Sequence, residues 1–320
     1  MIVYGESLVL ANTKPGRLCF DNIVPGSLSV RSTYERNMKN TIIYREGRDY
    51  IVDTEQGTIA RTADSRIPDF GTNVLYAQKE FDHTKFPGYG NHAFFVWVDY
   101  DTKKVRPLAV ESDQSEFLAG TRKRLEAGGP FGILVYGDSI STGCEASRER
   151  LQFYHRYTDA LKRRFPAAEI NIENGATGGD STIQGLERLD AKVLTRKPGL
   201  VLMGFGMNDH NVGSVPVGRF CENLIAMAHS IRERTGAEVL MYSAFPPNPD
   251  WKFSSHRMEE YAEATRRAAA ESGCAYANVY SVWTEVLKRK DFPSLLGNNI
   301  NHPNDFGHYL YLTALLAVEF

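Results

Sequence analysis

The chain contains 320 residues, of which 42% are hydrophobic and 24% are charged. These fractions are ordinary for a globular protein and exclude wholesale disorder. At about 100–200 residues per domain, the length favours two domains or one large one. The 37 basic and 39 acidic residues leave a formal net charge of −2, so the composition gives no electrostatic support for binding nucleic acid or an anionic membrane.

The sequence also lacks the patterns of a targeting signal, a membrane-spanning helix and a disulfide-bonded protein. No stretch approaches the roughly 20 consecutive apolar residues of a membrane-spanning helix. The opening MIVYGESLVL lacks a basic region and soon becomes polar, so we expect no cleaved export signal. The four cysteines lie far apart without a CxxC pair, which indicates reduced thiols rather than disulfides or a zinc site. We therefore expect a soluble, cytoplasmic protein.

Residues 1–110 alternate apolar and polar side chains in short runs. Turn residues such as Pro25-Gly26, Gln56-Gly57 and Pro87-Gly88 separate several of these runs, and no helix-period stretch interrupts them. The pattern predicts an all-β accessory domain, a sandwich of the jelly-roll kind. The expected strands lie within residues 1–10, 27–31, 41–44, 50–53, 58–62, 73–78 and 94–100.

The periodicity changes after Ser112. Residues 113–127 have a helical pattern that ends in Gly128-Gly129-Pro130, so we assign residues 111–130 to a linker helix. From residue 131 to residue 320, short apolar runs alternate with longer helical patterns. The expected strands are 131–136, 169–172, 200–205, 238–243 and 275–279, and the expected helices are 148–164, 182–196, 217–235, 255–272, 282–290 and 305 to the end.

Five continuous apolar strands that alternate with helices indicate an α/β domain, residues 131–320, whose parallel sheet is covered on both faces. A flavodoxin-like, doubly wound strand order fits this alternation. In such a sheet, ligands bind beyond the carboxyl ends of the strands, where the loops gather. The functional residues should therefore lie in those loops.

The loops of this edge contain a serine, a glycine-rich turn, an asparagine and a histidine, which together suit acyl transfer. A second Gly-Asp-Ser sequence ends at Ser181, but Ser181 opens a helix, where N-capping is the ordinary role. Ser139 instead follows an apolar strand directly, so Ser139 is the candidate nucleophile. The four blocks are Gly137-Asp138-Ser139-Ile140-Ser141, Asn174–Asp180, Gly206-Met207-Asn208-Asp209 and His302-Pro303-Asn304.

These blocks, in this order, resemble the SGNH/GDSL hydrolase superfamily over roughly residues 131–320. The resemblance implies that Ser139 is the nucleophile and His302 the general base. It also implies an oxyanion hole made by the backbone N–H groups of Ser139 and Gly179 and the side-chain amide of Asn208.

One position departs from the family pattern. The family usually has an aspartate three residues before the histidine, and this chain has Asn299 there. An asparagine can still orient His302 through a hydrogen bond, but it offers no negative charge to the imidazolium. The site is then a Ser-His dyad oriented by Asn299 or by a backbone carbonyl, or a triad completed by another acid. Asp305 is the nearest acid, although it also suits the first turn of the last helix, after Asn304 as the N-cap.

Two aromatic residues lie in the loop that follows the fourth strand of the α/β domain. Trp251 and Phe253 could bind a sugar ring or simply pack within their loop. His210 and His308 flank the motifs and are expected to be structural. The sequence has no HExxH, P-loop or Rossmann fingerprint, so we expect neither a metal nor another cofactor.

The layout resembles the two-domain carbohydrate O-acetylesterases of carbohydrate esterase family 2. This resemblance implies an acetylated oligosaccharide or another small ester as the substrate. Two alternatives stay open: a short-chain lipid esterase or thioesterase, and a catalytically weak carbohydrate-binding protein. The N-terminal domain could bind glycan, wall the active site or form a homo-oligomer contact.

Overall fold

The computed structural model describes residues 1–104, 106–211 and 215–320, which form two compact units. The first unit comprises Met1–Leu108, Asp250–Lys252 and Glu285–Gly307. The second unit comprises Ala109–Pro249, Phe253–Thr284 and His308–Phe320. The range Met1–Leu108 ends close to residue 110, where the sequence predicts the end of the N-terminal domain. The segment 285–307, which was expected in the α/β domain, groups instead with the N-terminal strands.

The second unit is built on a five-stranded parallel sheet, as predicted. Its strands follow the order β10-β9-β11-β12-β13, in which the first strand along the chain lies between the second and the third. This is the flavodoxin-like order. Side chains Leu200–Met203 of β11 are fully buried, because helices cover both faces. The strands are β9 (Gly129–Gly137), β10 (Ala168–Asn174), β11 (Leu200–Gly204), β12 (Glu238–Tyr242) and β13 (Ala275–Ala277).

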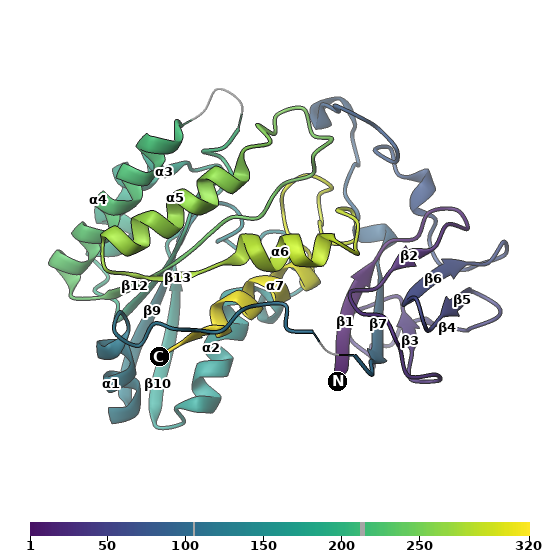
Figure 1. Cartoon of the computed structure of the whole chain (residues 1–320), viewed down its shortest axis with the longest axis horizontal. Helices are drawn as coiled ribbons and strands as arrows, with labels where there is room; N and C mark the ends of the chain where they lie inside the picture. Colours follow the sequence, from purple (N-terminus) through teal and green to yellow (C-terminus); the bar gives the residue numbers. More distant parts are fainter. Residues whose placement is uncertain (105, 212–214) are drawn as a thin grey trace. The chain divides into compact units, whose positions relative to one another are not determined.

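Helices α3, α4 and α5 lie on one side of the sheet, and α1 and α2 lie on the other (Figure 1). Phe153 of α2 stacks on Tyr311 of α7 with ring centroids 5.0 Å apart. Helix α4 ends where predicted because Gly236 adopts a positive φ of 72° and donates its N–H to Arg232 O. The helices are α1 (Ala119–Ala127), α2 (Phe153–Arg164), α3 (Thr182–Leu189), α4 (Val217–Thr235), α5 (Met258–Glu271), α6 (Val279–Leu287) and α7 (Asp305–Leu316).

Several of the predicted helices are shorter than expected; for example, the helix predicted over 148–164 begins at Phe153, and the last helix stops at Leu316. The helix predicted over 113–127 begins only at Ala119, because β8 (Ser112–Asp113) pairs with β14 (Val318–Glu319). Just beyond β8, the Gln114 side-chain amide donates to Tyr276 O and accepts from Tyr276 N, each at 2.8 Å. This pairing covers the backbone of the edge strand β13. The helix predicted over 182–196 divides into α3 and a π-helical turn at Asp190–Leu194.

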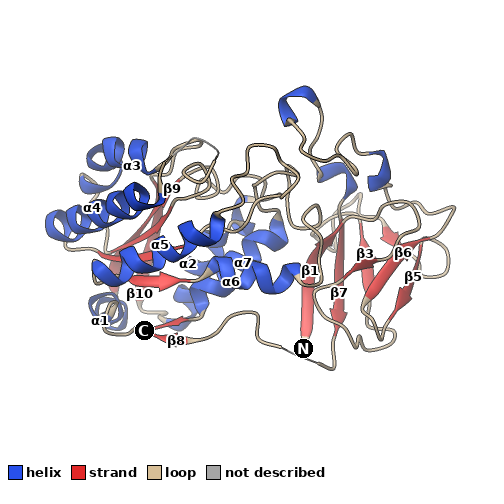
Figure 2. Ribbon diagram, turned by 45° about the horizontal axis from the view of Figure 1, so that its top comes forward, coloured by secondary structure: helices blue, strands red, loops and turns tan. Residues whose placement is uncertain are grey.

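The first unit contains antiparallel sheets and short helical turns (Figure 2). The expected strand at 73–78 is wrong, since Asn73 caps the short helix η1 (Phe70–Thr72) and its Oδ1 accepts the N–H of Leu75. One sheet has the order β1-β7-β3-β4, made of Ile2–Leu8, Val96–Asp101, Ser29–Arg31 and Ile43–Tyr44. The other has the order β2-β6-β5, made of Gly16–Arg17, Thr58–Arg61 and Tyr50–Asp53.

Buried polar contacts explain why the segment 285–307 groups with the N-terminal strands. Lys290 Nζ forms an ion pair with Glu6 of β1 at 2.6 Å, and both side chains are fully buried. Ser7 Oγ donates to Ser294 O at 2.8 Å. Arg289 donates to the carbonyl of Leu18 at 3.1 Å. The segment is therefore an integral part of the first unit.

No helix within the described residues is both long enough and apolar enough to span a membrane.

Candidate active site

Ser139 lies in the loop that follows β9, at the carboxyl end of an interior strand of the sheet. The side chain is 9% exposed. The carbonyl oxygen of Ser139 accepts a hydrogen bond from Thr142 Oγ1 at 2.7 Å, and Asp138 Oδ1 accepts the N–H of Ile140 at 2.9 Å. Gly137 is required just before this turn, because a Cβ there would collide with the Gly204 carbonyl and the Ser141 side chain. The sequence thus fixes Ser139 in a tight, internally bonded loop.

The glycine-rich loop after β10 packs against Ser139. Thr177 donates its backbone N–H to Gly137 O at 2.9 Å, and Asn174 Nδ2 donates to Ser141 O at 2.8 Å. A Cβ placed on Gly178 would lie 3.8 Å from the Cβ of Ser139. The backbone of this loop therefore runs beside the serine side chain. Gly179 follows with a positive φ of 83° that side-chain-bearing residues rarely adopt.

Asn208, in the loop after β11, joins the same group. Its Nδ2 donates to Asp180 O at 2.9 Å. A primary amide has two N–H donors, so this bond commits one of them. The structure therefore brings together Ser139, the Gly178–Gly179 backbone and Asn208 at one edge of the second unit. This corner combines a hydroxyl, which can attack a carbonyl carbon, with amide donors, which can stabilise the oxyanion that forms.

Two buried ionisable residues follow Asn208. Asp209 Oδ1 accepts from Thr182 N at 2.8 Å and from Thr182 Oγ1 at 2.6 Å. Burial raises the pKa of Asp209 to about 6, although the Thr182 hydrogen bonds oppose this shift. Burial lowers the pKa of His210 to about 4, and its Nδ1 lies 2.5 Å from Met207 O. His210 is therefore structural, as predicted.

The second Gly-Asp-Ser sequence has the structural role that the sequence predicted. Ser181 caps α3: its side chain accepts from Ile183 N, and Gln184 reaches back to Ser181 N at 3.0 Å. Asp180 pairs with Arg188. These contacts distinguish Ser181 from Ser139.

His302 belongs to the first unit and lies in a loop, residues 297–302, which we call the base loop. Gly297 donates its N–H to His302 O at 2.9 Å, which closes the loop. Asn298 Oδ1 accepts the backbone N–H groups of Ile300, Asn301 and His302 at 2.9–3.0 Å. Since Ser139 and His302 belong to different units, their pairing stays a prediction.

Asn299 occupies the position of the usual family aspartate, and it adopts a positive φ of 63°. Its Oδ1 accepts from Asn91 Nδ2 at 3.0 Å. Its Nδ2 donates to Asn73 Oδ1 at 3.3 Å and to Tyr89 O at 3.4 Å. The side chain is 2% exposed. Asn299 is thus held by the N-terminal residues, and its action on His302 stays a prediction.

The residues at the start of α7 behave as expected from the sequence. Asn304 Oδ1 accepts the N–H groups of Phe306 and Gly307 at 3.1 and 3.0 Å, which makes Asn304 the N-cap. Asp305 is buried in the first turn, and its Oδ2 accepts from Trp97 Nε1 at 3.2 Å.

Comparison with known proteins identifies the family. The model of the GDSL-like lipase/acylhydrolase family matches residues 135–310. The chain belongs to this family. An arylesterase of Vibrio mimicus is 31% identical over 122 residues, which cover 38% of this chain and 59% of that protein. Esterase TesA of Pseudomonas aeruginosa is 31% identical over 120 residues, 36% of this chain and 56% of that protein. The chain thus spans less than two thirds of these relatives.

Solved structures show the same fold at low identity. A two-domain esterase (CEX) active on acetylated mannans aligns with a TM-score of 0.53 and 22% identity, covering 65% of this chain and 54% of that one. The acetylxylan esterase Axe2 of Geobacillus stearothermophilus aligns with a TM-score of 0.51 and 20% identity, covering 61% of this chain and 97% of that one.

The two aromatic candidates of this GDSL family member differ in their surroundings. Trp251 belongs to the first unit, is 5% exposed and packs with Leu75, Phe81 and Ile300. Its Nε1 donates to His83 Nδ1 at 3.1 Å. The Trp251 ring is therefore packed within its unit rather than open to a sugar. Phe253 belongs to the second unit and is 36% exposed.

Sequence reasoning missed Asn91 and Asn73, whose amides contact Asn299. Both lie in loops of the N-terminal region, more than 200 residues from Asn299 in sequence. No motif or periodicity marks either residue. A polar asparagine in a glycine-rich turn, as at Asn91, gives no signal beyond turn formation.

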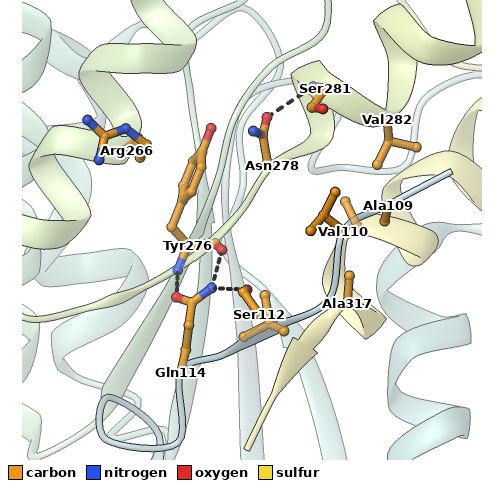
Figure 3. A pocket seen from close by; sticks show the side chains of 12 residues that line it. Ala109, Val110, Ser112, Gln114, Arg266, Tyr276, Asn278, Ser281, Val282 and Ala317 are labelled. Carbon is orange, nitrogen blue, oxygen red and sulfur yellow. Dashed lines mark hydrogen bonds between the residues drawn. The ribbon is translucent and has the colours of Figure 1, made fainter. Parts of the chain in front are cut away.

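The second unit of this GDSL protein also contains a pocket of about 300 Å³ (Figure 3). Its lining is mainly apolar and includes Val110, Val282 and Ala317. Two of its polar side chains are engaged in hydrogen bonds: Gln114 bonds both backbone groups of Tyr276, and Asn278 Oδ1 accepts from Ser281 N at 3.0 Å. None of the four sequence blocks lines this pocket, so it is separate from the group formed by Ser139, the Gly178–Gly179 backbone and Asn208.

Proposed function

We propose that this protein is a serine esterase that removes acetyl groups from an O-acetylated carbohydrate. The observation that carries the proposal is the corner formed by Ser139, the Gly178–Gly179 backbone and Asn208 in a chain of the GDSL family. This corner supplies a nucleophile beside amide donors, as acyl transfer requires.

In the proposed mechanism, His302 takes the proton of Ser139 while the serine oxygen attacks the ester carbonyl. The N–H groups of Ser139 and Gly179 and the Asn208 amide stabilise the negative oxygen that forms. Each such donor contributes ~10²–10³ in rate. His302 then protonates the departing alcohol. In the second half of the reaction His302 activates water, which releases acetate from the acyl-enzyme.

The choice of an acetylated carbohydrate rests on structural neighbours. CEX is active on acetylated mannans, and Axe2 is an acetylxylan esterase. The loops of the corner are polar and rich in glycine and asparagine, which suits a short acyl group and a hydroxylated alcohol. The alternative is a short-chain lipid esterase or thioesterase. It is supported by the two relatives, which are an arylesterase and an esterase.

The test is acetate release from a panel of acetylated oligosaccharides. We expect Ser139→Ala and His302→Ala each to lower kcat at least ~10³-fold, because each removes a group essential to the acyl-enzyme. Ser181→Ala is the matched control: it alters the other Gly-Asp-Ser sequence, removes an N-cap and costs about 1 kcal/mol of stability, but it should leave kcat unchanged.

A series of nitrophenyl esters separates the alternatives. A sharp fall in kcat/KM beyond acetyl supports deacetylation, whereas a rise toward octanoyl shows a lipid esterase. Tight glycan binding without acetate release would show a carbohydrate-binding protein instead.

A further inference from the structure

Within the first unit, one buried side chain holds the base loop to the N-terminal residues. Asn91 is fully buried. Its Nδ2 lies within hydrogen-bond distance of three acceptors: Leu296 O at 2.9 Å, Asn299 Oδ1 at 3.0 Å and Pro293 O at 3.1 Å. Its backbone N–H donates to Gly297 O at 2.7 Å. Asn91 therefore contacts the base loop and the residues that lead into it.

The neighbours of Asn91 complete this support. Asn73 Nδ2 lies 3.4 Å from Asn91 Oδ1, which orients the Asn91 amide with its nitrogen toward the base loop. Asn73 Oδ1 and Tyr89 O accept from Asn299. Ile300, inside the base loop, packs on Leu75 and Phe81. The loop is thus joined to the N-terminal residues by amide bonds at one end and by apolar packing in its middle.

We propose that Asn91 is a positioning residue for the general base. The inference rests on the proposed function, in which His302 moves the protons of the reaction. Asn298 shapes the base loop internally, and Asn91 joins that loop to the N-terminal residues of the first unit. The N-terminal region is then part of the catalytic machinery, and not a detachable accessory module.

The proposal has a kinetic signature that a loss of folded enzyme cannot imitate. A nitrophenolate leaves as a stable anion, whereas a sugar alkoxide must be protonated by His302 as it leaves. A displaced His302 should therefore slow sugar acetates more than nitrophenyl acetate. The ratio of the two kcat values does not depend on how much of the enzyme is folded.

The experiment compares kcat and KM for both substrates in the full-length wild type and in Asn91→Ala. We expect kcat on an acetylated oligosaccharide to fall ~10²-fold, as for a misplacement of about 1 Å, with a smaller fall on nitrophenyl acetate and little change in KM. Asn91→Ser, which keeps one donor, should give an intermediate ratio. It also serves as the test if Asn91→Ala does not fold.

Asp49→Ala is the control for stability. Asp49 is fully buried in the same unit and bonds Arg45 and Arg66, not the base loop. It should lower the melting temperature and leave the ratio of kcat values unchanged. An unchanged ratio in Asn91→Ala and Asn91→Ser, or an equal change in Asp49→Ala, would overturn the inference.

The same data separate this inference from the proposed function. A wild type that releases no acetate, or that keeps its activity in Ser139→Ala, rejects the esterase itself. An active, Ser139-dependent wild type whose ratio is insensitive to Asn91 rejects only the positioning role.

Discussion

Asn299 shows why an asparagine can replace the aspartate usual in this family. Its Nδ2 donates to Asn73 Oδ1 and to Tyr89 O, while its Oδ1 accepts from Asn91. An aspartate would place a carboxylate oxygen against those two acceptors, and the two hydrogen bonds that Asn299 donates would be replaced by repulsion between oxygens. The positive φ suits either residue, because both tolerate the left-handed region. The surroundings therefore select the amide.

We accordingly expect Asn299→Asp to lower the free energy of unfolding by about 1–3 kcal/mol without raising kcat. Urea denaturation and acetate release check the two parts. Asn299→Ala should cost far less activity than Ser139→Ala or His302→Ala. A gain in kcat with the aspartate would show that the missing charge, and not the amide network, limits the enzyme. Equal losses in the three alanine variants would make Asn299 a full catalytic member.

Asp209 and His210 are adjacent residues whose pKa values move in opposite directions across the same pH window. Folding raises the pKa of Asp209 from 3.8 to about 6, so the folded state binds more protons between those values, and Asp209 lowers stability as pH rises through them. Folding lowers the pKa of His210 from 6.5 to about 4, so the unfolded state binds more protons there, and His210 raises stability as pH rises. In the wild type the two slopes oppose each other.

Single variants should separate the pH dependence that each residue contributes to the free energy of unfolding. Between pH 4 and 6, the free energy of unfolding of Asp209→Asn should rise more steeply with pH than that of the wild type, and that of His210→Asn should rise less or fall. Each difference is on the order of 2–3 kcal/mol across the window. Urea denaturation at half-unit pH steps measures it. Three parallel curves would mean that neither group titrates as its burial implies.

At the scale of elements, the sequence predicted the parallel sheet well because a doubly covered sheet leaves a clear pattern. The strand at 200–205 appears as β11, whose residues are wholly buried, and α4 has the predicted limits because Gly236 provides a definite stop. The helix expected from residue 113 failed because a short strand pairing with the C-terminal residues displaced its first turn. That pairing is non-local and has no local signature.

The sequence predicted the loops of the candidate site in the α/β domain but not the surroundings of the base loop. The rule that loops gather at the carboxyl edge of a parallel sheet led to Ser139, Gly179 and Asn208, and the loops that contain them are in contact. The association of the base loop with the N-terminal strands could not be predicted, because it depends on contacts such as Asn91 with Asn299. Such contacts depend on three-dimensional packing, and a single asparagine in a turn leaves no sequence pattern that predicts them.

At the scale of the whole molecule, the two units are interleaved along the chain. The segment 285–307 belongs to the first unit although it follows most of the second. Lys290 and Glu6 secure it, and Glu6 also accepts from Tyr100 OH at 2.7 Å and from Cys19 N at 2.8 Å. Both carboxylate oxygens of Glu6 are therefore bonded inside the unit.

Lys290→Ala should lower the free energy of unfolding by about 3–5 kcal/mol, since it leaves the buried Glu6 carboxylate without its counter-charge. Lys79→Ala is the matched control. It removes a surface ion pair with Asp250, whose lysine is 76% exposed, and should cost about 0–1 kcal/mol. Urea denaturation of both variants measures the difference. Comparable losses would show that the buried pair contributes no more than a solvated one.

The interleaving has a consequence for how a ribosome makes this protein. Glu6 is synthesised before its partner Lys290, which follows 284 residues later. Until Lys290 has been synthesised, the nascent β-sheets carry a carboxylate without its counter-charge at a buried site, so the first unit cannot close fully before that residue appears. A gene cut near residue 108 would therefore encode one fragment in which Glu6 lacks Lys290 and another in which Lys290 lacks Glu6.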